Sequence, residues 1–440
     1  MKKLKTVISL FLVAIMFTGC SMRISSSIDD MISPISPFGD NADIKNAMDE
    51  FLTKGYSIKT PSIGEYITAY NLFDIDGDGD EEAIAFYEPN DNLGRTDMAL
   101  LKKVDDKWTV IESVAGEGAE VSSLDFSDLN GDDRSEMIVC WDKIRHSTNH
   151  ELAIYKYNAK AKTKHMRRTY NGISVNNYIP VDITGDGVDD LLMFELISGS
   201  RTYAKAELYS FAEDTPILRG ETKLDGHINS YTELKVETVD GNKRVYADAI
   251  CTNGSSMLTE IIYWADRYNT IISPFYSYST GLSSGTTRNA LLSSRDVNGD
   301  GRFEIPRDKK LKKMPKSVSC MDWGVYKNSI LIHTDYTLSP VNDGYLVVIP
   351  DKYIYDIKVK YNSKTKQMTI LDKSDNTEVC SVKPVLKATY EKDDHLGYVK
   401  VMEDAGYYYL AKSGDSENVD ISIKYLKKNI KSLNNREENI

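Results

Sequence analysis

The pattern of hydrophobic and polar residues divides the chain into an N-terminal apolar segment, a short helical stretch and a long series of strands. Residues 7–17 form an apolar run that only Ser9 interrupts. Residues 42–54 carry apolar side chains at helical spacing, and we expect this helix to pack on the domain that follows, although a partner could also bind it. From about residue 60 short apolar runs recur, and some, such as 137–141 and 191–194, do not alternate. Runs without alternation are typical of strands covered on both faces, so the pattern predicts a mainly β protein.

An acidic loop recurs between the predicted strands. In its first copy, Asp74, Asp76, Asp78 and Glu82 stand at positions 1, 3, 5 and 9, and two glycines bend the loop. The same spacing begins again at residues 128, 182 and 296, at intervals of 54, 54 and 114 residues. A repeat of about 55 residues fits these intervals. The long interval predicts a further copy near residue 239 that keeps a turn but lacks the carboxylates.

The spacing aims the four side chains of the first loop at one point, with the Asp80 carbonyl as a fifth oxygen. Cations of calcium's size take about six to eight oxygen ligands. Carboxylates held about 4 Å apart repel each other by about 1 kcal/mol in water and about 4 kcal/mol near a protein surface, and a cation relieves this repulsion. An EF-hand is excluded, because position 12 is Ala85, Val139, Met193 or Arg307 in strand-like sequence. The residues therefore predict a calcium loop within a hairpin.

Each repeat has the order strand, acidic loop, continuous apolar strand and two further strands. Both faces of such strands are covered when four-stranded sheets stack radially, as the blades of a β-propeller do. We therefore predict a β-propeller of about five blades over residues 59–338; a six-bladed ring would need a blade from the C-terminal region. Residues 339–440 contain further strand-like segments and a helical stretch at 419–433, which predict a small α+β domain.

The repeats resemble the FG-GAP/VCBS repeats of integrin-alpha-type β-propellers, in which an Asp-rich loop joins the first two strands of a blade. This resemblance implies up to four Ca²⁺ ions. The side-chain ligands that it implies are Asp74, Asp76, Asp78 and Glu82; Asp128, Asn130, Asp132 and Glu136; Asp182, Thr184, Asp186 and Asp190; and Asp296, Asn298, Asp300 and Glu304. Asp80, Arg134, Val188 and Arg302 stand at the position of the backbone carbonyl ligand. The C-terminal region resembles the α+β domain of clostridial-type surface lipoproteins, which implies no activity.

The N-terminus predicts export and a lipid anchor. Three lysines precede the apolar run, and the small residues ending in Cys20 resemble a bacterial lipobox. Residues 1–20 would then be a lipoprotein signal peptide, and residues 21–58 a tether followed by the short helix. The alternative is an ordinary cleaved signal with an incidental cysteine. We expect the protein on the extracytoplasmic face of a bacterial cell membrane, attached through lipidated Cys20.

Charge and cysteine content narrow the possible partners. The formal net charge is −12, and loss of the three signal lysines would make it −15, so nucleic-acid binding is not expected. Besides Cys20, four cysteines lie in or beside strand-like stretches and are expected to be buried hydrophobic residues, with one disulfide as an alternative outside the cell.

The loops opposite the acidic ones carry basic and aromatic residues. If the repeats are blades, these loops share one face, which would suit an anionic envelope polymer, phospholipid head groups or an acidic protein. The alternative is a solvated surface with no specific role. The residues of this candidate ligand face are Arg95, Arg145, His146, Arg201, Tyr276, Arg307 and Lys309.

The function predicted from these features is binding or scaffolding, with structural calcium. The segment 281–285 matches G-x-S-x-G, but a nucleophile elbow needs a strand before it and a helix after it. His146 and His150 lack the glutamate of a zinc-protease motif. An envelope hydrolase or lyase with an active site in the propeller funnel is the alternative, and a purely structural envelope protein is a third possibility.

Overall fold

The computed structural model describes residues 39–145, 147–197, 203–212, 215–392, 395–404 and 406–433. The predicted signal peptide with Cys20, the tether up to residue 38, His146 and Arg201 lie outside the described residues. Within these ranges the chain is mainly β, and its two α-helices are α3 (Asp40–Phe51) and α4 (Ile423–Asn429). None of the described helices has the length and apolar character needed to cross a membrane.

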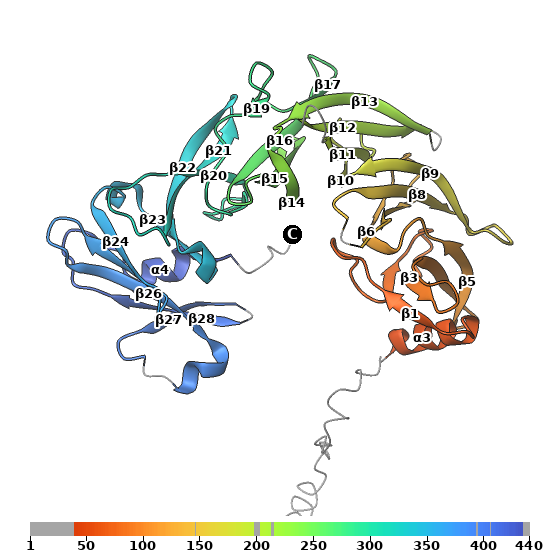
Figure 1. The fold of residues 1–440 in the computed structure, drawn as a ribbon, viewed down its shortest axis with the longest axis horizontal. Helices are drawn as coiled ribbons and strands as arrows, with labels where there is room; N and C mark the ends of the chain where they lie inside the picture. Colours follow the sequence, from red (N-terminus) through yellow and green to blue (C-terminus); the bar gives the residue numbers. More distant parts are fainter. Residues whose placement is uncertain are drawn as a thin grey trace, which may run out of the picture.

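The described strands form six successive antiparallel sheets of four or five strands, which we number 1 to 6, and one two-stranded hairpin (Figure 1). Sheet 1 contains β1 (Tyr56–Lys59), β2 (Asn71–Phe73), β3 (Glu82–Pro89), β4 (Asp97–Val104) and β5 (Lys107–Ala115). Sheet 2 contains β6 (Glu120–Ser127), β7 (Glu136–Asp142), β8 (His150–Tyr157) and β9 (Met166–Val175). Sheet 3 contains β10 (Asn177–Val181), β11 (Asp190–Ile197), β12 (Tyr203–Ala212) and β13 (Thr215–Leu224).

The remaining sheets follow in chain order. Sheet 4 contains β14 (Ile228–Val239), β15 (Asn242–Cys251), β16 (Met257–Ala265) and β17 (Thr270–Ile272), followed by the small hairpin β18 (Tyr276–Ser277) and β19 (Leu282–Ser283). Sheet 5 contains β20 (Glu304–Asp308), β21 (Ser319–Lys327), β22 (Ile330–Ser339), β23 (Tyr345–Ile349) and β29 (Ile430–Ser432). Sheet 6 contains β24 (Ile357–Asn362), β25 (Gln367–Asp372), β26 (Glu378–Leu386), β27 (Val399–Glu403) and β28 (Tyr407–Ser413).

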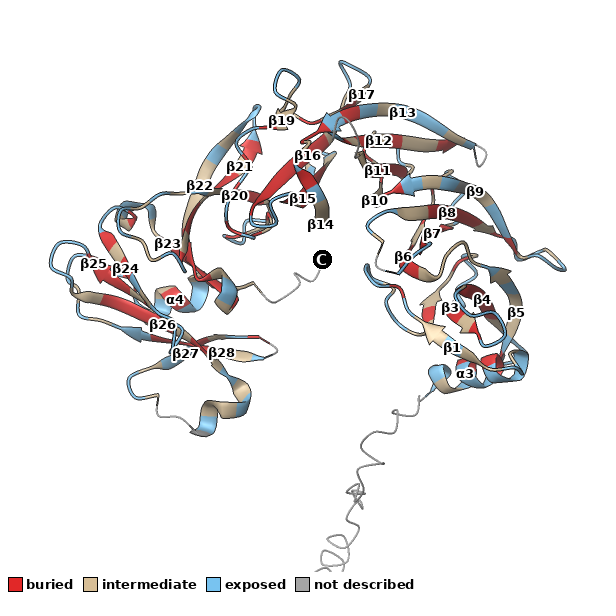
Figure 2. Cartoon of the chain, viewed as in Figure 1, coloured by how far each residue is buried: buried red, intermediate tan, exposed pale blue. Residues whose placement is uncertain are grey.

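The continuous apolar strands are covered on both faces, as predicted. In β3, Ile84 and Phe86 join a core shared with sheet 2, whereas Ala83 and Ala85 face α3. In β7 and β11 alternate residues likewise enter the cores shared with the preceding and the following sheet. Because each sheet is one layer in a stack, the residues at the middle of the sheets are buried on either side (Figure 2).

The two ends of the stack are covered by different elements, and the arc of sheets stays open (Figure 1). Helix α3 places Ile44, Ala47 and Met48 against the outer face of sheet 1. At the other end, sheet 6 and α4 share a core with Cys320, Leu338 and other residues of sheet 5. The described residues therefore do not form the predicted ring. The apolar faces that would meet in a closed ring are already buried by α3 and by sheet 6.

The C-terminal region is continuous with sheet 5. Strand β23 pairs with β22 through Thr337 and Val348, and β29 then pairs with β23. The predicted boundary at residues 338 and 339 thus falls inside one sheet, because β23 supplies the backbone partner that the edge of β22 needs. The helix predicted over 419–433 is shorter than expected, since residues 430–432 form β29 instead.

Candidate metal centres

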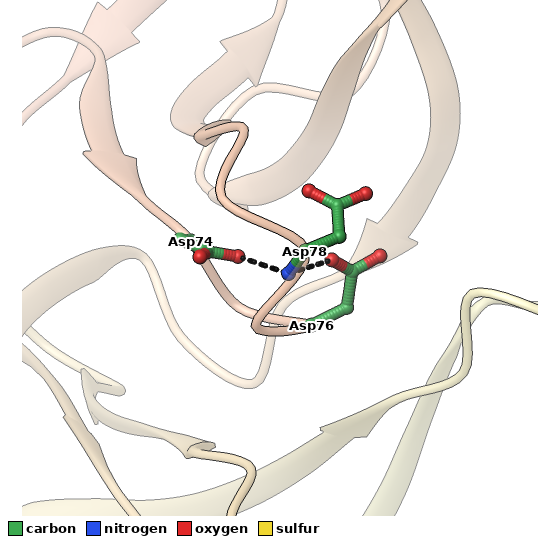
Figure 3. Close-up of side chains that lie close together, drawn as sticks. All are labelled: Asp74, Asp76 and Asp78. Carbon is green, nitrogen blue, oxygen red and sulfur yellow. Dashed lines mark hydrogen bonds between the residues drawn. The ribbon is translucent and has the colours of Figure 1, made fainter.

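Four acidic loops precede β3 of sheet 1, β7 of sheet 2, β11 of sheet 3 and β20 of sheet 5. We call them loop 1 (residues 74–82), loop 2 (128–136), loop 3 (182–190) and loop 5 (296–304). In loop 1 the backbone amide of Asp78 donates to Asp74 at 3.1 Å and to Asp76 at 3.3 Å (Figure 3). The amide of Gly79 donates to Asp74 at 2.9 Å. These hydrogen bonds fold the chain around the first aspartate and turn the following carboxylates to the same side.

The other three loops repeat this backbone arrangement. The aspartate at position 1 (Asp128, Asp182 or Asp296) accepts amide hydrogen bonds from the residues at positions 4, 5 and 6, at distances from 2.6 to 3.2 Å. Glycine fits position 4 because φ there is positive, for example 74° at Gly131. The spacing of oxygen-bearing side chains read from the sequence therefore corresponds to one repeated loop conformation.

The carboxylate at position 9 closes each loop from the sheet side and is buried. Glu82, Glu136, Asp190 and Glu304 have exposed fractions of 1%, 3%, 1% and 0%. In loops 1, 2 and 5 this carboxylate accepts a hydrogen bond from the amide at position 2, at 2.9 to 3.2 Å. Burial raises the pKa of Asp190 to about 6, of Glu136 to about 7 and of Glu304 to about 8. Ionising these groups is therefore costly unless a cation lies beside them.

The donor set fits a hard divalent cation best in loop 5. One ligand oxygen from each of Asp296, Asp300 and Glu304 lies within 4.8 Å of the others, and the same holds for Asp74, Asp76 and Asp78 in loop 1. Asn298 lies beside Glu304, to which its amide nitrogen donates at 3.4 Å. Calcium accepts such sets of carboxylate and carbonyl oxygens.

Loop 3 offers three aspartates and a hydroxyl. The amide of Thr184 donates to Asp190 at 3.3 Å. The Thr184 hydroxyl is buried and has no well-aligned hydrogen-bond partner in the described part of the chain. It is thus an oxygen that a bound cation could use.

Two of the side chains at position 7 make contacts outside their own loops. The Arg302 guanidinium donates to Glu237 of β14 at 2.8 Å. A methyl group of Val188 lies close beside Gly131 of loop 2. The side chains of Asp80 and Arg134 are exposed. Adjacent loops and turns therefore contact one another along the stack.

Two lysines that the sequence analysis did not single out enter loops 1 and 2. Lys102 of β4 places its Nζ 3.1 Å from Asp76, 2.9 Å from Asp78 and 2.8 Å from Glu82. Lys156 of β8 lies 2.7 Å from Asp132 and 3.5 Å from Glu136. The two lysines are 54 residues apart, which is also the interval between loops 1 and 2. This shared interval is the sequence signal that could have linked the lysines to the loops.

The predicted copy near residue 239 is a turn without carboxylate ligands. Asp240 and Gly241, with φ of 51° and 81°, join β14 to β15 as a two-residue hairpin; we call residues 239–242 turn 4. Glu237, just before it, accepts hydrogen bonds from the amide of Phe303 at 3.0 Å and from the Tyr246 hydroxyl at 2.8 Å. Sheet 4 is therefore linked to loop 5 by a side chain.

The candidate ligand face has less positive charge than its sequence suggests. Arg95 pairs with Asp97 at 2.6 Å, Arg145 with Glu120 at 3.3 Å, and Arg307 with Asp322 at 3.0 Å. These carboxylates offset the charge that an anionic partner would need.

The other two described residues of this face contact aromatic groups. Lys309 donates to the Tyr355 hydroxyl at 2.8 Å and lies over the Tyr336 ring, and Tyr276 packs edge-to-face on Tyr278. The sequence alone could not show which carboxylates pair with these arginines, because the tertiary structure determines the pairing.

The remaining sequence motifs have local structural roles. Ser283 lies in the two-residue strand β19 and donates to buried Glu260, so it does not stand on a nucleophile elbow. His150 is hydrogen-bonded to Asp142. The four cysteines within the described residues are buried and free.

Comparisons with known proteins do not identify the chain. A scan against protein-family models finds no match, and a search of curated proteins finds none either. Among solved structures, the rhamnogalacturonan lyase YesW is similar at 11% identity with a TM-score of 0.34, covering 81% of this chain and 72% of the lyase. A rhamnogalacturonan lyase from Bacillus licheniformis is similar at 11% identity and TM-score 0.30, with coverage of 81% and 72%. A hypothetical selenium-binding protein from Sulfolobus tokodaii is similar at 12% identity and TM-score 0.29, with coverage of 49% and 55%. Likenesses at these scores carry no argument about this chain.

Proposed function

We propose that this protein is a calcium-stabilised, lipid-anchored binding or scaffolding protein on the extracytoplasmic face of a bacterial cell membrane. The observation that carries the proposal is the convergence of Asp296, Asp300 and Glu304 in loop 5. No lysine or arginine within the described residues forms a salt bridge with these three carboxylates. A divalent cation is the simplest group that would offset their charge.

Calcium suits the loops better than magnesium does. Calcium tolerates irregular shells of carboxylate, carbonyl and water oxygens, whereas magnesium requires a near-ideal octahedron and keeps several waters. The candidate ligands are the residues at positions 1, 3, 5 and 9 of each loop, and the ion would supply only positive charge. We take the stacked sheets for FG-GAP/VCBS-type blades, because four of them have an acidic loop directly before a strand near the start of the sheet.

The anchor and the binding role rest on other observations. The lipobox-like residues ending in Cys20 support attachment to the membrane. A stack of sheets with both ends covered supports a rigid display platform. The partner surface would be the face that carries Tyr276 and Lys309, with an anionic polymer or a protein as the candidate ligand.

Thermal unfolding of the mature chain tests the calcium proposal. Extracellular calcium loops bind with Kd of about 0.1–1 mM, so 5 mM calcium should stabilise the protein by about 1–2 kcal/mol per site. We expect the melting temperature to be higher in 5 mM calcium than in EDTA, with a smaller effect of 5 mM magnesium. Superimposable melting curves in calcium and EDTA would contradict the proposal.

A further inference from the structure

We propose that Lys102 and Lys156 act as tethered cations that occupy loops 1 and 2, so that calcium binds at loops 3 and 5 only. This inference rests on the proposed function, because it concerns which of the acidic loops hold the ion. It changes the expected number of bound ions from four to two.

The position of Lys102 is that of a cation in the middle of loop 1. Its Nζ contacts one oxygen from each of Asp76, Asp78 and Glu82 at distances between 2.8 and 3.1 Å. A lysine ammonium is a compact point charge with three donors, and here it donates to Asp76 and Asp78 and forms an ion pair with Glu82. Glu82 is buried and its Oε1 has no hydrogen-bond partner within the described residues, so the ammonium 2.8 Å away is the charge that compensates it. A calcium ion could reach this carboxylate only if Lys102 moved out.

Loop 2 makes the same arrangement with fewer acids. Lys156 donates to Asp132 at 2.7 Å and lies 3.5 Å from buried Glu136. Loop 1 has carboxylates at all four ligand positions, whereas loop 2 has Asn130 at position 3. With one negative charge fewer, loop 2 should exclude calcium more strongly than loop 1 does.

The register of the sheets explains why loops 3 and 5 lack this cation. Leu101 pairs with Ala83, which places Lys102 beside Glu82 across the ladder. In sheet 5 the residue opposite Glu304 is Val325. In sheet 3 the equivalent position, next to the pair Leu191 and Tyr209, is Ser210. Neither Val325 nor Ser210 carries a charge. Beside loop 3 the Arg219 guanidinium donates to the Ser210 hydroxyl at 3.4 Å, but within the described residues it forms no salt bridge with the loop carboxylates.

Loop 5 also has an additional acid nearby. Asp335 of β22 accepts a hydrogen bond from the Asn298 amide at 2.9 Å. The surroundings of loop 5 are thus more negative than those of loop 2, where a lysine occupies the corresponding space. A medium-supplied cation is required in loop 5, whereas loop 2 carries its own.

The test is the number of calcium ions bound by the mature chain, counted by equilibrium dialysis and native mass spectrometry at saturating calcium. We expect two ions for the wild type, three for Lys156→Met and four for Lys102→Met/Lys156→Met. The reciprocal variant Val325→Lys should bind one. Lys103→Met is the matched control, because Lys103 is next to Lys102 but pairs with Asp40 at 3.3 Å, and it should bind two.

The outcomes separate this inference from the proposed function. Four ions on the wild type would overturn the role of the lysines while leaving calcium binding intact. No ions on any variant would overturn the proposed function itself. Two ions on both the wild type and the double variant would show that the lysines do not exclude calcium. If the lysine variants do not fold, loss of one ion in Val325→Lys supports the inference, and an unchanged count of two contradicts it.

Discussion

Sheets 4 and 5 are neighbours that hold negative charge in opposite ways. Sheet 5 begins with loop 5, where Asp296, Asp300 and Glu304 converge and no described residue forms a salt bridge with them. Sheet 4 has turn 4 in place of such a loop. One of its buried carboxylates, Asp248, instead lies 2.9 Å from the guanidinium of Arg288, and both side chains are inaccessible to solvent.

Other groups of the protein supply the hydrogen bonds and the positive charge that the buried Asp248 carboxylate needs. Asp248 accepts hydrogen bonds from Thr259 at 2.5 Å and from the Ser294 hydroxyl at 2.7 Å, and Arg288 also donates to the Leu292 carbonyl. Burial alone would raise the pKa of Asp248, but Lys235 and Arg288 lower it below its ordinary value. The carboxylate is therefore held ionised by groups of the chain.

This comparison indicates that the repeats use three sources of positive charge. Sheet 4 uses a fixed buried arginine, sheets 1 and 2 use a lysine from β4 and β8, and under the calcium proposal loop 5 depends on an ion from the medium. A fixed cation makes the stability of the fold independent of ionic conditions. An exchangeable ion makes that stability respond to calcium, and only in the repeats that lack an internal cation.

The largest loss of stability is expected for Arg288→Met. The substitution leaves Asp248 buried with only the more distant Lys235 at 3.5 Å. Breaking a buried ion pair from one side costs about 3–5 kcal/mol. Urea denaturation should show this loss equally in calcium and in EDTA, because no exchangeable ion is involved.

The double variant Arg288→Met/Asp248→Leu is the control for this prediction. Removing both charges should recover part of the lost stability, since no uncompensated carboxylate remains. Arg219→Met, at an arginine that stacks on the Trp264 ring, provides a matched substitution outside the network. A loss below about 1 kcal/mol for Arg288→Met would place the pair among weak surface-type interactions.

An intermediate effect is expected for Asp300→Asn in loop 5. The variant removes one ionised ligand, so it should lose most of the stabilisation that calcium gives at this loop, about 1–2 kcal/mol at 5 mM calcium. In EDTA the same substitution should be neutral or slightly stabilising, because it relieves repulsion from Asp296 and Glu304. Unfolding curves with and without calcium measure both values.

Turn 4 supplies the matched control for loop 5. Asp240→Asn makes the same chemical change at a position with φ of 51°, which asparagine tolerates. The response of this variant to calcium should equal that of the wild type. If Asp300→Asn and Asp240→Asn respond to calcium alike, loop 5 is not the calcium-dependent element.

The local and periodic features were the ones that the sequence could predict. The four loops and turn 4 depend on residues close together in the chain, so their spacing determines their conformation. The unalternating segments such as 137–141 correctly indicated strands buried on both faces. The helix near residue 44 also packs on the sheets, as its apolar spacing indicated.

The features that were missed depend on contacts between distant segments. The role of Lys102 could not be predicted from the sequence, because the pairing of β3 with β4 is what places it beside Glu82. The open arc results from α3 and sheet 6 covering the end faces, and no repeat pattern encodes which element covers a terminal sheet. Strand β29 joins sheet 5 across more than eighty residues of intervening chain, as its pairing of Ile430 with Val347 shows.

The smallest effect on stability is expected for Asp125, a half-buried carboxyl group between sheets 2 and 3. It adds to the comparison a fourth way of offsetting a negative charge. It accepts a hydrogen bond from the Tyr178 hydroxyl at 2.5 Å, and burial raises its pKa to about 6. Its charge is thus relieved by a proton. Because the folded pKa lies above the ordinary value of 3.8, its contribution to stability is complete below pH 4 and is lost as the pH rises through 6.

Asp125→Asn should remove this pH dependence. The free energy of unfolding of the wild type relative to the variant should fall by about 1 kcal/mol between pH 4 and pH 7, given that one pKa unit corresponds to about 1.4 kcal/mol and that partial exposure reduces the effect. Asp106→Asn, at an exposed hairpin position, should leave the pH profile unchanged. A wild-type profile parallel to that of Asp125→Asn would show that Asp125 is ionised throughout this range. A compensating cation would then have to be sought at this junction as well, and sheet 3 would join sheets 1, 2 and 4 among the repeats that depend on fixed charge.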